Sequence, residues 1–226
     1  MKNKVFYYLF FVLIFLYIGL LAFNQDNLSN FLKPLIIPSL IAYTLINPKF
    51  KTRKLLLVAL IFSWIGDVIL IFAPIHQFYF VFGLVAFLIS HLVYIKLFIK
   101  QNITTSNYRF LIIIPILITY LIGFLYILWN NLNQLKVPVT IYAIVIASML
   151  FFATKGYFNW KGKEKVYILV GALFFIISDS ILAINKFYVT LQYNSLLIMI
   201  TYILAQFLIV YGICSINKKA PVTDAI

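Results

Sequence analysis

Eight long apolar stretches, separated by short polar segments, dominate this sequence and leave little choice of fold. A helix needs about 20 mostly apolar residues to cross the hydrocarbon core of a bilayer. Inside lipid, only helices and closed barrels satisfy their own backbone hydrogen bonds. The sequence therefore predicts an all-α integral membrane protein with eight transmembrane helices, at residues 5–23, 34–47, 55–73, 78–98, 110–128, 137–153, 166–184 and 195–216.

Composition supports lipid as the main solvent of this chain. Hydrophobic residues make up 65% of the 226 residues and charged residues only 10%, whereas about a quarter of a soluble domain is charged. The loops are too short to hold a soluble domain, so residues 1–226 are expected to form one membrane domain. The expected location is a membrane crossed several times, the inner or plasma membrane if the chain is bacterial.

The net charge of +13 raises the question of a nucleic-acid partner, but its distribution indicates membrane topology instead. When successive loops are assigned to opposite sides of the membrane, the outer side holds only Lys33, Lys136 and Lys186. Basic residues accumulate on the cytoplasmic side, so both termini are expected there and no nucleic-acid partner is predicted. The other side holds fifteen basic residues: Lys2, Lys4, Lys49, Lys51, Arg53, Lys54, Lys96, Lys100, Arg109, Lys155, Lys161, Lys163, Lys165, Lys218 and Lys219.

The two halves of the chain resemble each other. Residues 15–18 and 124–127 both read Phe-Leu-Tyr-Ile, and Gly66-Asp67-Val68-Ile69-Leu70 has a counterpart in Ser178-Asp179-Ser180-Ile181-Leu182. The two aspartates stand 112 residues apart. This pattern predicts a parallel internal repeat of four helices each, at about 1–108 and 109–226. We expect the third and seventh helices to face each other across a central cavity.

Asp67 and Asp179 are the strongest candidates for function. Both lie roughly 18–20 Å along their helices from the cytoplasmic side, slightly past the midplane. A carboxylate inside the bilayer costs a few kcal/mol or more and usually faces the protein interior. Two readings are open: hydrogen bonds that hold helices together, or an acid–base pair that shares a proton. Matching depth in matching helices favours the second.

Other polar side chains inside the spans could line a site. Gly83, Phe87, His91 and Tyr94 recur at helical spacing on one face of the fourth span. The polar candidates also have structural explanations. His91 could be a packing residue, and Ser63 could bond a backbone carbonyl. Tyr202 and Gln206 could join helices by a hydrogen bond, and Lys33, at the outer end of the second span, could anchor the helix at the membrane interface. The candidates for substrate binding are Lys33, Ser63, His91, Tyr94, Tyr202 and Gln206.

The chain lacks the sequence motifs of the common hydrolases and nucleotide-binding proteins. It has no G-x-S-x-G, no H-E-x-x-H and no P-loop. A metal site of His91 with both aspartates has little support, so no metal is predicted. If the chain is an enzyme, its carboxyl groups must do the chemistry.

At these residues the chain resembles the YhhN-like membrane family, whose characterised animal members are lysoplasmalogenases. The resemblance covers essentially the whole chain and keeps both aspartates. It is carried by Lys33-Pro34, by residues 66–70, by Phe78 through Gly83 with Phe87, His91 and Tyr94, by Gly171 through Phe174, by Ser178 through Ala183 with Phe187, and by Thr201 through Gln206.

The resemblance implies hydrolysis of the vinyl ether bond of a lysoplasmalogen, without a cofactor. The products would be a fatty aldehyde and a glycerophosphoethanolamine or glycerophosphocholine. Asp67 and Asp179 would be the acid–base pair, Lys33 would receive the headgroup, and the remaining candidates would line the pocket. Two alternatives stay open from the residues alone. One is a small-molecule or proton-coupled transporter, and the other is a non-catalytic membrane protein whose aspartates only join helices.

Overall fold

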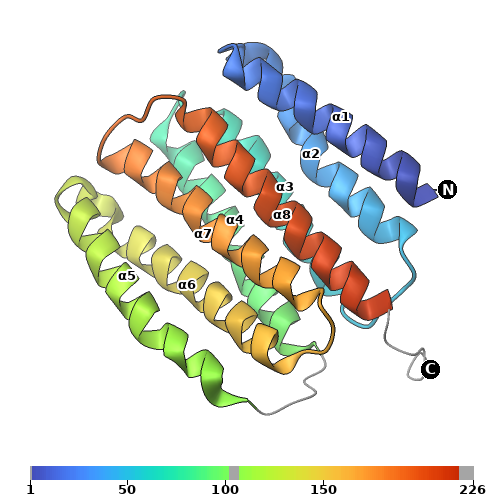
Figure 1. Ribbon diagram of the computed structural model, residues 1–226. Helices are drawn as coiled ribbons and strands as arrows, with labels where there is room; N and C mark the ends of the chain where they lie inside the picture. The colour runs from blue at the N-terminus through green and yellow to red at the C-terminus, as the bar shows by residue number, and fades with distance from the viewer. Residues whose placement is uncertain (1, 102–106, 219–226) are drawn as a thin grey trace. The chain divides into compact units, whose positions relative to one another are not determined.

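The computed structural model describes residues 2–101 and 107–218, and all of its regular structure is helical (Figure 1). The described residues form eight α-helices, as predicted from the apolar stretches. Short 3₁₀ segments occupy Tyr108–Ile112, Trp129–Asn131 and Asn133–Leu135. The helices are α1 (Lys2–Ala22), α2 (Asp26–Ile46), α3 (Arg53–Ile71), α4 (Gln77–Ile99), α5 (Ile113–Leu128), α6 (Lys136–Asn159), α7 (Lys165–Phe187) and α8 (Asn194–Lys218).

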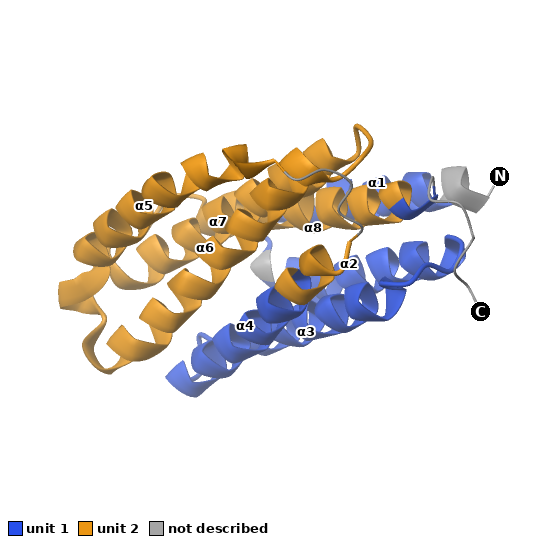
Figure 2. Ribbon diagram, turned by 90° about the horizontal axis from the view of Figure 1, so that it is seen from below, with its two compact units in different colours: residues 1–94, 217–226 blue, residues 95–216 orange. Residues whose placement is uncertain are grey.

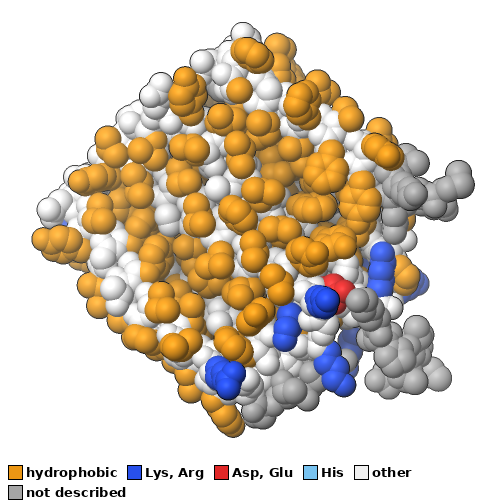
Figure 3. Space-filling view, in the orientation of Figure 1, with side chains coloured by type: hydrophobic (Ala, Val, Ile, Leu, Met, Phe, Trp, Pro, Cys, Tyr) orange, Lys and Arg blue, Asp and Glu red, His pale blue; other side chains and the backbone are white. Residues whose placement is uncertain are grey.

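The helices have the length and surface of transmembrane segments. Within the described residues, seven helical stretches are long and apolar enough to cross a bilayer, and Phe6–Ala22 of α1 forms a shorter apolar helix. Large hydrophobic side chains face outward, among them Phe15 and Tyr126. Figure 3 shows hydrophobic side chains over most of the visible surface. The chain is therefore a multi-pass integral membrane protein.

The predicted bounds of two helices were wrong. The second helix begins at Asp26 rather than at residue 34, so part of the polar stretch taken for a loop is helical. The sixth continues to Asn159 rather than ending at residue 153. There, polar side chains support the last turns: Thr154 donates to the Leu150 carbonyl and Asn159 donates to the Lys155 carbonyl. A polar stretch of sequence therefore does not by itself mark the end of a helix. Lys219, counted among the basic residues, lies outside the described residues.

Two prolines lie inside α2, and a neighbouring helix compensates for one of them. Pro38 has no N–H, so the carbonyl of Pro34, four residues earlier, loses its partner within the helix. The indole Nε1 of Trp64 on α3 donates to this carbonyl oxygen at 2.8 Å. A helix in lipid tolerates proline when a neighbour satisfies the freed carbonyl. This hydrogen bond therefore keeps α2 helical and sets its contact with α3.

The described chain divides into two compact units, which Figure 2 distinguishes by colour. One unit comprises residues 2–94 with 217–218, and the other comprises residues 95–216. The division falls inside α4, whereas the predicted halves meet near residue 108. The single membrane domain stays a prediction, and each unit is described by itself below.

In the first unit, α3 and α4 pack antiparallel at close range. The Ser63 and Ser90 hydroxyl groups are hydrogen-bonded at 2.8 Å. A Cβ added at Gly66 would lie only 2.6 Å from the Phe87 ring. Moving along α3 from residue 63 to residue 66, the partner on α4 moves back from residue 90 to residue 87. Small residues thus bring the helix that carries Asp67 close to its neighbour.

In the second unit, α7 and α8 pack in the same antiparallel manner. Ser178 Oγ donates to the Ile198 carbonyl at 3.0 Å. The rings of Phe175 and Tyr202 meet edge to face, with centroids 5.6 Å apart. The contact on α8 moves forward from residue 198 to residue 202 as the contact on α7 moves back from residue 178 to residue 175, so the two helices run antiparallel. This packing positions the helix that carries Asp179.

Gly171 is expected to be the most sensitive glycine of this helix pair. A Cβ at position 171 would lie 2.9 Å from the Ala205 carbonyl oxygen and 3.0 Å from the Ile209 nitrogen. Because these are backbone atoms, Gly171→Ala should lower the free energy of unfolding by about 1–3 kcal/mol. Thermal unfolding of the purified protein in detergent measures this loss. Gly123→Ala is the matched control because no atom lies within 4 Å of a Cβ there, and an equal loss in both variants would contradict the packing described.

Candidate functional site

Asp67 is a buried carboxyl group in the last third of α3, four residues before its end, and is only 3% exposed. Lys33 on α2 interacts with it electrostatically. The position predicted for Lys33 was wrong: because α2 begins at Asp26, Lys33 is its eighth residue, about 10 Å along the helix rather than at its mouth. The Trp64–Pro34 bond joins the two helices beside this pair, so Lys33 and Asp67 belong to one α2–α3 contact.

A hydroxyl pair lies one helical turn from Asp67. Ser63 and Ser90 are both fully buried. Ser90 also donates to the Ala59 carbonyl oxygen at 2.9 Å. Ser63 was expected either to line a site or to bond a backbone carbonyl, and both stay predictions. Its described partner is a hydroxyl of α4, and Ser90 makes the described carbonyl bond. The sequence analysis missed Ser90, although a serine inside an apolar helix needs such a partner.

The predicted stripe on α4 faces α3 at the two positions where contacts are described. A Cβ at Gly83 would meet Leu70, and Phe87 covers Gly66. His91 and Tyr94, further along α4, are fully buried. His91 follows Ser90, which pairs with Ser63, so it lies about one turn below Asp67 along the helix. Among the described residues, no group of three His, Cys, Asp or Glu side chains could hold a metal ion.

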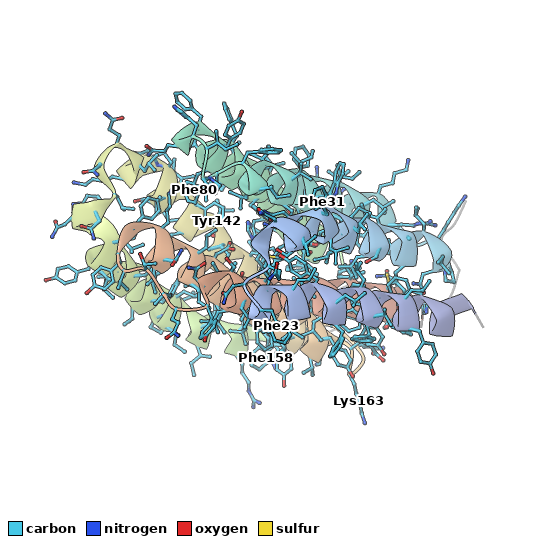
Figure 4. All side chains as sticks on the ribbon, turned by 90° about the horizontal axis from the view of Figure 1, so that it is seen from above. Phe23, Phe31, Phe80, Tyr142, Phe158 and Lys163 are labelled. Carbon is cyan, nitrogen blue, oxygen red and sulfur yellow. The ribbon has the colours of Figure 1, made fainter. Side chains whose placement is uncertain are left out.

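Asp179 lies in a cluster of hydroxyl groups supplied by three helices of the second unit. The phenol of Tyr142 on α6 donates to Asp179 Oδ2 at 2.5 Å. Tyr120 on α5 bonds Ser180 Oγ at 2.8 Å, and Ser180 also donates to the Ile176 carbonyl. Tyr120 interacts electrostatically with both Asp179 and Tyr142. Figure 4 labels Tyr142 on its helix. Asp179 therefore has the Tyr142 phenol as its described hydrogen-bond donor, whereas Lys33 is described only as interacting electrostatically with Asp67.

Tyr202 and Gln206 lie on one face of α8, as predicted from their spacing. Gln206 Nε2 donates to Tyr202 Oη at 3.4 Å, and both residues are buried. The ring of Tyr202 also packs against Phe175 on α7. The pair thus belongs to the α7–α8 contact. The expectation that it shares the depth of Asp179 was wrong: Ile198 lies opposite Ser178 and Tyr202 opposite Phe175, so Tyr202 is about one helical turn from Asp179 and Gln206 about two. Its role in substrate binding stays a prediction.

Asp67 and Asp179 belong to different compact units. Within its own unit, Asp67 interacts electrostatically with Lys33 of α2, and Asp179 accepts a hydrogen bond from Tyr142 of α6. That the two aspartates line one shared cavity stays a prediction.

Comparison with known proteins decides the family. The model of the YhhN family matches residues 28–213. The chain belongs to the YhhN family. Every candidate residue of the site lies within the matched part. No solved structure matches this YhhN protein.

Curated relatives of this YhhN protein carry one activity in their names. The chain is 33% identical over 171 residues to lysoplasmalogenase TMEM86A of Bos taurus, covering 74% of this chain and 67% of that protein. It is 30% identical over 182 residues to the human lysoplasmalogenase TMEM86B, covering 79% and 70%. A lysoplasmalogenase of Mycobacterium bovis is 29% identical over 177 residues, covering 76% and 65%. The matches thus span about two thirds of each relative's length.

Tyr142, Tyr120 and Ser180 were missed when the YhhN protein was read from its sequence. Tyrosine is common here, with 16 in the chain, and an isolated tyrosine in a span resembles packing or an interface residue. Nothing in the spacing within α6 indicates a partner on α7. The one available signal was Ser180, one residue after Asp179, because adjacent polar residues in an apolar helix rarely lack partners.

The Lys33–Asp67 interaction can be tested by a double-mutant cycle. Lys33→Met leaves the buried Asp67 carboxylate without its ammonium partner, so it should lower the free energy of unfolding by about 1–3 kcal/mol. Adding Asp67→Asn should recover part of this loss, giving a coupling energy of about 1 kcal/mol or more. Denaturation in mixed micelles measures each variant. Lys163→Met, at an exposed loop position, is the control and should change stability little, and additive losses for residues 33 and 67 would count against the pair.

Proposed function

We propose that this YhhN protein is a membrane-embedded ether hydrolase that cleaves the vinyl ether bond of lysoplasmalogens. The observation that carries the proposal is the family match over residues 28–213, together with curated relatives named lysoplasmalogenase. The products are a fatty aldehyde and a glycerophosphoethanolamine or glycerophosphocholine. A lipid substrate suits a chain whose potential active groups lie inside apolar helices.

The chemistry of a vinyl ether fits the groups that the chain offers. Protonation of the β-carbon gives an oxocarbenium ion, water adds to this ion, and the resulting hemiacetal collapses to the aldehyde and an alcohol. The reaction needs an acid that holds a proton and a carboxylate that stabilises the cation or accepts a proton from water, as in the two-carboxylate glycosidases. Asp67 and Asp179 are the carboxyl groups proposed for these roles, and no cofactor is needed.

The substrate-binding residues are proposed with one revision. Ser63, His91, Tyr94, Tyr202 and Gln206 are buried polar side chains and remain candidates to line the pocket. Lys33 lies within α2 and interacts electrostatically with Asp67 of α3. This placement supports a role as a counter-ion for Asp67 more than a role in holding a headgroup.

Proton-coupled transport is a second candidate, because paired carboxyl groups in two similar halves are also typical of secondary transporters. Turnover separates the two functions. A hydrolase releases aldehyde from a lysoplasmalogen in detergent, where no gradient exists. A transporter moves its substrate into proteoliposomes and leaves the lipid intact.

The internal repeat is proposed on the helix bounds. A shift of 112 residues carries the bounds of α3, 53–71, to 165–183, close to α7 at Lys165–Phe187. The same shift carries α2 from 26–46 to 138–158, close to α6 at Lys136–Asn159. The shift is that of the two aspartates, so independent features agree on one offset.

A contact between helices supports the same repeat. The shift of 112 residues carries the pair Ser63–Ser90 onto the pair Phe175–Tyr202. Both pairs lie where two antiparallel helices meet, one within each unit. The register between helices is therefore the same in the two halves, although the chemistry of the contact differs. Such a difference is expected of a repeat whose halves have separate tasks.

The hydrolase is tested by replacing either proposed carboxyl group. Purified wild-type protein should release aldehyde from a lysoplasmalogen, and Asp67→Asn or Asp179→Asn should lower the rate by about 10²–10⁴-fold or more. Glu164→Gln is the matched control, since Glu164 lies in the loop before α7, and should retain the wild-type rate. Full activity in either aspartate variant would eliminate the proposed mechanism.

The proposed orientation, with both termini in the cytoplasm, is tested by cysteine labelling. The only cysteine, Cys214, is buried, so Cys214→Ala gives a suitable background. Lys163, which extends away from the helices in Figure 4, lies in the α6–α7 loop. Lys163→Cys should react with a membrane-impermeant maleimide only after the cells are opened, whereas Ile75→Cys in the α3–α4 loop should react in intact cells. The reverse pattern would invert the topology.

A further inference from the structure

A groove runs between the last turns of α4 and α6, and all of its residues belong to the second unit. One charged side chain stands among apolar ones in its lining. The lining residues are Phe98, Ile99, Phe152, Lys155, Gly156 and Trp160. Such a groove can hold a ligand that has an apolar part and a negatively charged part.

The indole of Trp160 lies against the end of α6. The backbone becomes extended at this residue, and its N–H donates to the Gly156 carbonyl at 2.7 Å. A Cβ at position 156 would collide with the indole, so the glycine allows the ring to fold back on the helix. The Phe98 ring of α4 meets the indole edge to face, with centroids 5.9 Å apart. The two rings therefore join the ends of α4 and α6 beside the groove.

The groove lies at the depth of lipid phosphates. Lys155 is the twentieth residue of α6, about 28 Å along the helix from its first residue. The hydrocarbon core is about 30 Å thick, so Lys155 reaches the boundary between hydrocarbon and headgroups. Its ammonium lies over the Phe110 ring, 5.7 Å from the centroid. A ring attracts an ammonium group without neutralising its charge.

More positive charge lies beside the groove. Two further lysines, Lys100 and Lys161, each directly follow a lining residue, and both are exposed. Between residues 95 and 165 the sequence has a single acidic residue, Glu164. The surroundings of the groove therefore favour an anion.

We propose that this groove binds one acidic phospholipid, with an acyl chain against the aromatic lining and the phosphate beside Lys155. The lipid comes from the leaflet at this end of the helices, which is the cytoplasmic leaflet in the proposed orientation. None of the candidate substrate-binding residues lines the groove, so the inference does not depend on the proposed hydrolysis.

Charge selects an acidic lipid over a zwitterionic one. In phosphatidylcholine the choline group offsets the phosphate charge, whereas phosphatidylglycerol keeps a net negative charge. Each lysine near the membrane surface favours an acidic lipid about 5-fold. Basic pockets between transmembrane helices on the cytoplasmic side bind acidic headgroups in this way.

Quenching of tryptophan fluorescence by brominated lipids tests the proposal. The protein is reconstituted into phosphatidylcholine vesicles that contain a rising fraction of phosphatidylglycerol brominated on its acyl chains. The contribution of Trp160 is the difference between the wild type and Trp160→Phe. It should reach half of its maximal quenching at a mole fraction about 5-fold lower for brominated phosphatidylglycerol than for brominated phosphatidylcholine.

Variants separate the groove from general surface charge. Lys155→Met should raise the half-quenching fraction of phosphatidylglycerol about 5-fold. Lys163→Met is the matched control, because it removes the same charge from a side chain that extends away from the helices (Figure 4), and it should behave like the wild type. Ile99→Phe adds bulk to the groove lining without changing charge, and it should lower the maximal quenching by either lipid.

A second charge variant covers the case in which Lys155→Met does not fold. Lys100→Met combined with Lys161→Met leaves Lys155 in place and alters only exposed positions. It should also raise the half-quenching fraction of phosphatidylglycerol.

Three results would overturn the proposal. Equal quenching of Trp160 by the two brominated lipids would mean that the groove holds any neighbouring lipid. Equal losses in Lys155→Met and Lys163→Met would assign the preference to diffuse surface charge. Relief of the quenching by a choline lysoplasmalogen at equal mole fraction would assign the groove to the substrate. The measurement requires no turnover, so it stands whether or not the protein is a hydrolase.

Discussion

The absence of water inside the bilayer is the constraint on which the whole structure depends. Each backbone N–H and C=O must find a partner within the protein, which forces every apolar stretch into a helix. Where a helix cannot complete its own ladder, another helix must do so. The bond from Trp64 to the carbonyl of Pro34 is such a case, and it brings α3 against α2 where Lys33 and Asp67 interact.

The same constraint governs the polar side chains. Ser63 and Ser90 bond each other, Ser178 bonds the backbone of α8, and Tyr142 bonds Asp179. Each bond joins two helices, so the groups that lipid penalises become the contacts that set helix register. Stability therefore draws on residues that are also proposed for function, and a substitution at either aspartate must be assayed for both.

The two units apply one packing scheme with different chemistry. In each, a side chain from the preceding helix reaches the aspartate: Lys33 interacts electrostatically with Asp67, and Tyr142 donates a hydrogen bond to Asp179. Each aspartate helix also packs antiparallel against the following helix, through a serine pair in one half and an aromatic pair in the other. In the proposed repeat, the two carboxyl groups thus have different described partners. Acid–base chemistry requires such a difference between the two groups.

The sequence by itself determined the all-helical class, the eight helices, most of their bounds and the two aspartates, because apolar length and intramembrane charge are local properties of a chain. It was wrong about where α2 begins, since it treated polar residues near Lys33 as a loop. Only the tertiary structure decided the described partners: Lys33 for Asp67, the phenol of Tyr142 for Asp179, and the Trp64 indole for the Pro34 carbonyl. The partners depend on the register between helices, and that register arises from packing contacts between residues dozens of positions apart. The sequence pattern of any single helix does not reveal it.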